Sequence, residues 1–373
     1  MEVLIPIILS GCGLVMISSL SLRNNMLEGN PYLAPLKQFQ FLGLGLALMI
    51  CCAMTPTSFF KKHSGKLWGI SIILLGLTLI PGIGIVSGGA RRWISIAGFR
   101  FQPFEILLFT LPIFMADRLN AERPNESKLL DKSSFKSFWK PTLMIAGISG
   151  FMIYRQPSLG GTIIVISICF MMHIENRGWK WPLRGALLGA GAIVLAILIA
   201  PYRLKRFKAF WDPWEDPTNA GFQIIQGLVA FANGSLTGVG IGRGLQEERY
   251  LPKADTDYIF PAIGEEFGLF GTLFLIFLYA LWTWRAYYVY KNAKKPFLKS
   301  LALGLTASVI FPMFVNVAGV TKIMPLSGIP MPFLSAGGSS MIFMWLKVGL
   351  LMAIKRETRE ANEKDKNEKN NDE

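Results

Sequence analysis

Long apolar runs recur along this 373-residue chain and constrain its fold more than any other feature. A helix needs roughly 17–25 residues to cross a bilayer, and only helices or closed barrels satisfy their backbone groups there. With 52% hydrophobic and 17% charged residues, the composition also excludes an average soluble domain. We therefore predict an all-α integral membrane protein of about ten transmembrane helices, at residues 3–20, 38–55, 67–87, 103–116, 141–155, 158–174, 183–201, 259–284, 300–320 and 333–354.

Lys and Arg residues are unequally divided between alternate loops. About 23 fall in the short loops and tail on one side, and about 7 in the short loops on the other. Cytoplasmic loops carry the excess of positive charge, so both termini are predicted to lie inside. We therefore attribute the net charge of +14 to the orientation of the protein in the membrane and to contact with anionic lipid headgroups. Nucleic acid is not an expected partner.

The organisation that follows is one polytopic membrane domain over residues 1–354. Its first span begins close to Met1 without a basic segment or cleavage site, so we expect it to be retained. Residues 355–373 form a charged cytoplasmic tail, expected to be a frayed helix followed by disorder. The cysteines all lie inside spans, where thiols behave as small apolar groups, and we expect neither a disulfide nor a metal cluster from Cys12, Cys51, Cys52 and Cys169.

The segment 202–258, between the seventh and eighth spans, is predicted to be a long outer loop. Long loops without secondary structure are usually functional or disordered, and this one is too aromatic for a disordered linker. No ATP is available outside, and the spacing of the glycines over 238–244 is not that of a nucleotide-binding loop. We interpret those glycines as a hinge or a close backbone contact, and the loop as a site at the membrane surface.

A carboxylate is the expected general base, because the two histidines, His63 and His173, are placed on the cytoplasmic side as interfacial residues. Asp257 is the best placed, at the predicted N-terminus of the eighth span. A helix cap is the alternative reading for it. Glu265 and Glu266 lie about 12 Å deeper in the same span, where ionisable groups face either a cavity or a partner. A substrate role and an ion pair with an Arg of another span both remain open.

Arginines of the outer loops are candidates to bind an anionic group such as a diphosphate. A guanidinium matches phosphate oxygens with two parallel hydrogen bonds. Snorkelling to the interface is the alternative for each of them. These candidates are Arg91, Arg92, Arg203 and Arg206.

Several separated motifs resemble those of the SEDS family (shape, elongation, division and sporulation). They are GGARRWISIAGFRFQPFE at 88–105, QPSLGGT at 156–162, PYRLKRFKAFWDPWEDPTNAGFQ at 201–223, YLPKADTDYIFPAIGEEFG at 250–268 and PLSGIPMPFLSAGGSS at 325–340. The resemblance covers nearly all of the spans. The sequence of the central loop, together with the GVGIGRG stretch that follows it, is most similar to the FtsW-like septal branch of the family. A RodA-like elongation polymerase, a lipid II flippase and a non-catalytic division scaffold are the alternatives.

The resemblance implies a peptidoglycan glycosyltransferase in the bacterial inner membrane, at the division septum. It would join a glycan on undecaprenyl diphosphate to the 4-hydroxyl of lipid II, with Asp257 as general base. It also implies a class B penicillin-binding transpeptidase and other division proteins as partners, and allows a divalent cation, Mg²⁺ or Mn²⁺. The substrate-binding residues that we expect are Arg92, Glu105, Arg203, Arg206, Lys253, Glu265, Glu266, Ser339 and Ser340.

The chain departs from the family pattern at several charged positions. Leu108 stands where a lysine usually follows the QPxE glutamate, and Ser158 replaces an acid. Lys253 and Asp255 replace a Glu and a His. Before YLP the family usually has a Lys and a Glu two residues apart, and this chain has the opposite charges there, Glu247 and Arg249. In the last outer loop Ser327 stands at the position of the family's lysine. Asp257 is kept, so the departures affect which cations bind the diphosphate.

Overall fold

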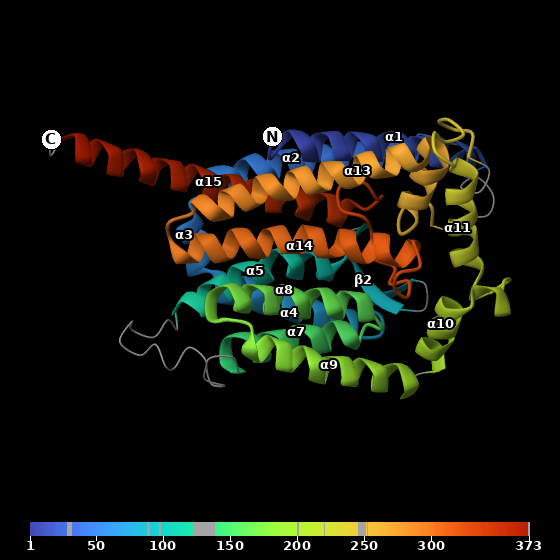
Figure 1. The fold of residues 1–373 in the computed structure, drawn as a ribbon, viewed down its shortest axis with the longest axis horizontal. Coiled ribbons are helices and arrows are strands. Elements are labelled where there is room, and N and C mark those ends of the chain that lie inside the picture. The colour runs from blue at the N-terminus through green and yellow to red at the C-terminus, as the bar shows by residue number, and fades with distance from the viewer. Residues whose placement is uncertain are drawn as a thin grey trace.

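The computed structural model is a bundle of long helices (Figure 1), and it describes residues 1–27, 32–87, 90–96, 98–121, 139–199, 201–219, 221–244, 251 and 253–371. The first half contains α1 (Leu4–Leu27), α2 (Leu33–Met54), α3 (Thr57–Lys62), α4 (Ser64–Thr78), α5 (Pro103–Ala121), the π-helix η2 (Trp139–Met144), α7 (Ile145–Tyr154) and α8 (Leu159–Arg177). The second half contains α9 (Lys180–Ile199), α10 (Pro201–Trp211), the 3₁₀ turn η3 (Pro213–Glu215), α11 (Phe222–Gly234), α13 (Ile259–Asn292), α14 (Pro296–Val320) and α15 (Gly338–Asn371).

Every predicted span contains a helix, and the corrections concern the ends. Within the described residues, α2, α8, α13, α14 and α15 are long and apolar enough to cross a membrane. The third predicted span was too long, because its helix ends at Thr78 and Pro81 and Gly82, with φ +92°, follow. The tenth was predicted to start at 333, but α15 begins at Gly338 after a turn in which Phe333 has φ +65°.

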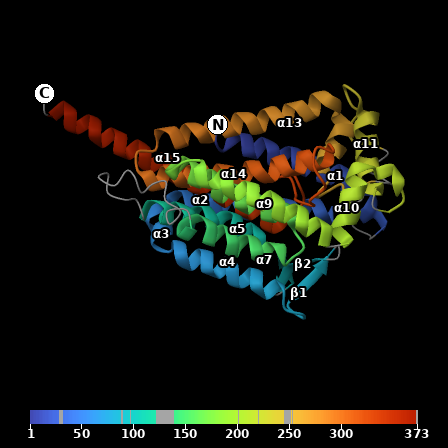
Figure 2. The same ribbon diagram turned by 60° about the horizontal axis from the view of Figure 1, so that its bottom comes forward.

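A small antiparallel sheet corrects the all-α prediction. It consists of β1 (Gly84–Ser87), β2 (Ala90–Ile96) and β3 (Phe99–Phe101), in the order β1-β2-β3. Ile85 pairs with Trp93, and Ser95 pairs with Arg100. Short β-branched and aromatic stretches favour this pairing over a continued helix. Figure 2 shows β1 and β2 at the same end of the bundle as α10 and α11.

The segment 202–258 is not the unstructured loop that we predicted. It contains α10, η3 and α11 in its described part. The Asp212 side chain accepts a hydrogen bond from the Trp214 backbone N–H at 2.9 Å and caps η3. Gly221 lets the chain turn back tightly, because a Cβ there would lie 1.9 Å from the Pro213 carbonyl oxygen. These turns place α11 beside the N-terminal half of α13 (Figure 1).

Small residues allow α2 and α15 to pack closely. A Cβ added to Gly45 would lie 3.0 Å from the Trp345 ring, and one added to Gly349 would lie 2.5 Å from the Met49 carbonyl oxygen. Close backbone approach at small residues is a common way for membrane helices to associate. The contact fixes the N-terminal third of α15 against α2.

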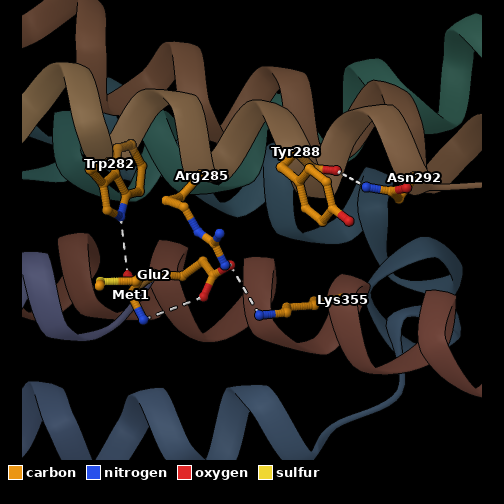
Figure 3. A network of polar contacts seen from close by, with 7 residues as sticks. All are labelled: Met1, Glu2, Trp282, Arg285, Tyr288, Asn292 and Lys355. Atoms are coloured by element: carbon orange, nitrogen blue, oxygen red, sulfur yellow. Dashed lines mark hydrogen bonds and ion pairs between the residues drawn. The ribbon is translucent and has the colours of Figure 1, made fainter.

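The N-terminus is held between the C-terminal part of α13 and the middle of α15 (Figure 3). The buried Glu2 carboxylate lies 3.0 Å from both the Arg285 and Lys355 side chains. The Trp282 indole N–H donates to the Glu2 backbone carbonyl at 3.1 Å. The N-terminus therefore lies at the opposite end of α13 from Asp257.

The tail differs from the predicted frayed helix and disorder. α15 continues without a break from the membrane domain to Asn371. Ion pairs between residues four apart, Arg356 with Glu360 and Arg359 with Glu363, support the projecting helix seen in Figure 1.

Candidate functional site

A cavity of about 430 Å³ lies where the segment before α13 meets the sheet and the loop before α15. Asp257 lines it, directly before Tyr258 at the start of α13. Three other residues predicted to bind substrate line the same cavity: Arg92, Lys253 and Ser340. Three segments far apart in sequence therefore converge at one cavity.

The Asp257 carboxylate is held between a lysine and a glycine. The Lys253 Nζ lies 3.7 Å from Asp257 Oδ2, with 55% of the lysine side chain and 13% of the aspartate side chain exposed. On the other side, a Cβ placed on Gly328 would lie 3.2 Å from the same oxygen. Gly328 has φ +65°, which favours glycine, so the loop before α15 can approach the carboxylate closely.

Hydrogen bonds fasten the Asp257 segment to the loop before α15. Asn316 Nδ2 donates to the backbone oxygens of Asp257 at 2.8 Å and Ile329 at 2.7 Å. Ser335 Oγ donates to the Thr256 carbonyl at 2.7 Å. These bonds use backbone atoms of the segment, so the Asp257 side chain is positioned while it faces the cavity.

Asp255 is a second carboxylate in the cavity lining. Burial raises the pKa of Asp255, while a backbone hydrogen bond and the Lys253 ammonium oppose that change. Its backbone oxygen accepts a hydrogen bond from the Ala336 N–H at 2.8 Å. The cavity therefore places two carboxylates beside one lysine.

The sheet supplies the basic wall of the cavity. Arg92 and Arg100 both line it, on strands β2 and β3. The Arg92 guanidinium also donates to the backbone oxygens of Gln156, at 3.2 Å, and Pro157, at 2.7 Å. Arg92 thus ties the sheet to the turn before α8, a contact that the sequence did not predict.

The two predicted serines stand at the start of α15, one in the cavity lining and one behind it. Ser340 lines the cavity, and Ser339 is buried and accepts a hydrogen bond from the Gln102 N–H at 3.2 Å. Glu105, which we expected to bind substrate, is 2% exposed and is not among the described lining residues. The Ser340 hydroxyl interacts with the Glu105 carboxylate, which links the cavity to the interior of the bundle.

Glu265 and Glu266 lie away from this cavity, around the glycine segment after α11. Glu265 Oε1 accepts a hydrogen bond from Asn233 Nδ2 at 3.0 Å. Glu266 Oε1 accepts from Ser19 Oγ at 2.7 Å and from the Gly242 N–H at 2.6 Å. These contacts come from an amide, a hydroxyl and a backbone N–H group.

The glycine segment makes the close backbone contact that was one of its two interpretations. A Cβ on Gly238 would lie 2.1 Å from the Glu266 carbonyl oxygen. Gly268 interrupts α13 with φ 66° and ψ −163°. A Cβ on Gly268 would lie 2.4 Å from the Gly238 nitrogen, so only glycines fit on both sides.

The remaining candidates lie elsewhere or outside the described atoms. His63 is half-buried, and His173 is buried, with a ring nitrogen 2.8 Å from Thr142 Oγ1. Arg91 is part of β2. Arg203 and Arg206 belong to α10, and their side chains lie outside the described part of the structure. Glu247 and Arg249 also lie outside the described residues.

Sequence reasoning missed Lys347, which is 1% exposed in the first third of α15. A signal was present, since this lysine interrupts an apolar run from Met341 to Ile354. Charged residues at such depth are costly and usually functional.

The cavity as a whole offers a carboxylate base, cations for an anionic group and hydroxyls for orientation. Asp257 is partly exposed, and the nearby cations are Lys253, Arg92 and Arg100. Such a set suits proton removal from a hydroxyl next to a negatively charged leaving group.

Comparisons with known proteins find similarity along almost the whole chain. The FtsW, RodA and SpoVE family model, described as "Cell cycle protein", matches residues 2–360. Stage V sporulation protein E of Bacillus subtilis (strain 168) is 33% identical over 360 residues, which cover 96% of each chain. The probable peptidoglycan glycosyltransferase FtsW of Pasteurella multocida (strain Pm70) is 33% identical over 352 residues, 93% of this chain and 87% of that protein.

Solved structures share the fold. A chain from a study titled "Structural coordination of polymerization and crosslinking by a peptidoglycan synthase complex" matches with a TM-score of 0.76 and 26% identity, covering 96% of this chain and 97% of that one. The rod shape determining protein RodA of Thermus thermophilus matches with a TM-score of 0.69 and 22% identity, covering 95% and 96%.

Proposed function

The chain belongs to the FtsW, RodA and SpoVE family, and we propose on this premise that it is a peptidoglycan glycosyltransferase that polymerises lipid II during cell division. The observation that carries the proposal is Asp257, whose carboxylate faces a cavity that also holds Lys253, Arg92 and Arg100. The names of the FtsW relatives support the same activity. The protein is a multi-pass membrane protein, and we place it at the septum.

Asp257 acts as the general base in the proposed reaction. Its carboxylate removes the proton from the 4-hydroxyl of lipid II, and that oxygen attacks the anomeric carbon of the glycan carried on undecaprenyl diphosphate. The bond from this carbon to the diphosphate oxygen breaks, and the leaving group takes the electron pair. General base catalysis of this kind contributes typically about 10²–10⁴-fold.

The cations of the cavity stabilise the departing diphosphate. Lys253 is exposed and next to Asp257, while Arg92 and Arg100 approach from the sheet. Fixed charges that face developing negative charge are among the largest contributions to catalysis. We assign the diphosphate to this basic side of the cavity.

A divalent cation fits the cavity only together with the substrate. The described residues contain no cluster of three or more metal-ligating side chains. Mg²⁺ is commonly held by one or two carboxylates plus substrate phosphates, and Asp255 and Asp257 are the carboxylates in this lining. When bound, the ion would neutralise part of the charge on the diphosphate.

We propose ten transmembrane spans with both termini in the cytoplasm, which puts the Asp257 cavity at the outer surface. Glu2 lies beside the C-terminal part of α13, whereas Asp257 lies at its start, consistent with this orientation. A class B penicillin-binding transpeptidase is the proposed partner, together with other division proteins. The peptidoglycan synthase complex among the structural matches supports this assignment.

The test is polymerisation of purified lipid II by the reconstituted protein with its transpeptidase and no other polymerase. Wild type should form glycan, and Asp257→Asn should form none while its melting temperature is unchanged, because Asn has nearly the same shape. Asp255→Asn is the matched variant in the same cavity and should lower activity without abolishing it, because Asp255 is assigned to the cation and not to proton removal. More than a few per cent of wild-type polymer from Asp257→Asn would remove it from the role of base. Glycan absent from wild type would favour a flippase or a scaffold.

A further inference from the structure

Lys347 is a charged side chain enclosed in the helix bundle. Only 1% of it is exposed, and its Nζ donates to the Ser308 backbone oxygen at 3.1 Å. The other contact of this nitrogen is the Met344 sulfur, at 3.7 Å. A buried ammonium is strongly unfavourable unless a negative charge balances it.

Glu105 on α5 carries the negative charge that acts on Lys347. The two groups interact electrostatically, although they lie beyond the 4.0 Å of a direct ion pair. Glu105 is 2% exposed, and its Oε2 has no hydrogen-bond partner among the described residues. In a medium of low dielectric constant, such charges attract one another over longer distances than in water.

The position that would give Glu105 a partner on its own helix holds an apolar residue. Leu108 is three residues further along α5, 1% exposed, and residues at this spacing share one helix face. The chain therefore lacks the local cation and has one on a different helix.

Two contacts connect this charge pair to the cavity. The Ser340 hydroxyl interacts with the Glu105 carboxylate and lines the cavity together with Asp257. The Gln102 N–H, just before α5, donates to Ser339 Oγ on α15. Glu105 thus lies beside the place where the starts of α5 and α15 meet at the cavity.

We infer that Lys347 is a positioning residue that supplies, from α15, the positive charge that Glu105 lacks on its own helix face, and that it thereby fixes Ser340 at the cavity. This inference rests on the proposed function for its catalytic readout. Lys347 does not touch the substrate in this scheme. It acts through Glu105 and Ser340.

The test moves the lysine from one helix to the other. Lys347→Met should lower lipid II turnover on the order of tenfold to a hundredfold, as misplacement of reacting groups does. Adding Leu108→Lys to this variant should restore most of the turnover, since the new lysine shares a face with Glu105. Leu108→Lys in the wild-type background should lower turnover and melting temperature, because it places two cations near one carboxylate.

The matched control is Lys355→Met, on the same helix but paired with Glu2 near the N-terminus. It should lower the melting temperature and keep turnover, and Leu108→Lys should not rescue it. If Lys347→Met does not fold, Lys347→Met with Glu105→Gln removes both charges and should fold better than either single change.

Two results would overturn the inference. The first is a Lys347→Met protein with the turnover and melting temperature of wild type. The second is a Leu108→Lys/Lys347→Met protein whose turnover and melting temperature are no higher than those of Lys347→Met. The melting temperatures need no polymerisation. If wild type makes no glycan, the proposed function fails, and the thermal coupling between positions 108 and 347 still decides this inference.

Discussion

The ammonium of Lys253 lies 3.7 Å from the carboxylate of Asp257, four residues further along the chain. Lys253 holds this place with a backbone φ of +58°, and its carbonyl oxygen accepts hydrogen bonds from the Thr256 and Tyr258 N–H groups. The segment before α13 is therefore a tight turn that brings a cation next to the proposed base. The resembled family usually has a glutamate here, so this cation is a feature of the present chain.

Replacement of Lys253 by Asn should weaken substrate binding without unfolding the protein. Asn tolerates positive φ better than most residues, so the turn is kept while the charge is lost. We expect the KM for lipid II to rise several-fold, since one cation facing the diphosphate is removed. Steady-state kinetics and a thermal unfolding curve check this. An unchanged KM would show that Lys253 serves the turn alone.

Asp255→Asn should stabilise the protein at neutral pH and lose this advantage in acid. Burial raises the pKa of Asp255 above its ordinary value of 3.8, so the ionised form costs folding free energy. That cost is absent below the unfolded pKa and complete above the raised folded pKa. The gain in melting temperature, about a few degrees at most, should therefore grow as pH rises from 4 to 8. A gain that shrinks with rising pH would contradict the burial of this carboxyl.

Gly268→Ala should prevent α13 from forming its break. The combination of φ 66° and ψ −163° is almost exclusive to glycine, and a new Cβ would lie 2.4 Å from the Gly238 nitrogen. We expect a loss of about 3 kcal/mol or more from strain and clash together, seen as a failure to recover folded protein. Gly76→Ala is the control, because nothing lies within 4 Å of its Cβ position inside α4, and it should be tolerated. Normal yield of Gly268→Ala would mean that α13 can straighten.

Much of the helical framework could be predicted from apolar runs, because a bilayer span has a fixed length and an apolar surface. The position of Asp257 at the start of a helix followed from the same pattern and is confirmed by α13, which begins at Ile259. The sheet was missed because its strands are short and adjoin an apolar run. The ends of α4 and α15 were misplaced because turns at Gly82 and Phe333 depend on backbone angles that composition does not reveal.

The assembly of the cavity could not be predicted, since it depends on contacts between segments that lie far apart in sequence. Asn316 bridges Asp257 and Ile329 through backbone oxygens, which no motif indicates. Lys347 approaches Glu105 from another helix, so a search for a partner within the QPxE motif finds only Leu108. Pairing across helices becomes visible only once α5 and α15 are placed together.

Arg92→Lys should reduce lipid II turnover more than Arg100→Lys does, although both arginines line the cavity. The Arg92 guanidinium presents its N–H donors in a planar fork and reaches the backbone oxygens of both Gln156 and Pro157, a geometry that an ammonium cannot reproduce. Lysine at this position keeps the positive charge, so any loss of turnover measures the contribution of the planar guanidinium group. We expect a decrease on the order of tenfold in kcat/KM, a small fall in melting temperature and unchanged binding of the transpeptidase. Normal kinetics for Arg92→Lys together with a damaged Arg100→Lys would move the diphosphate along the sheet towards β3, and would leave Arg92 as the tie between the sheet and the turn before α8.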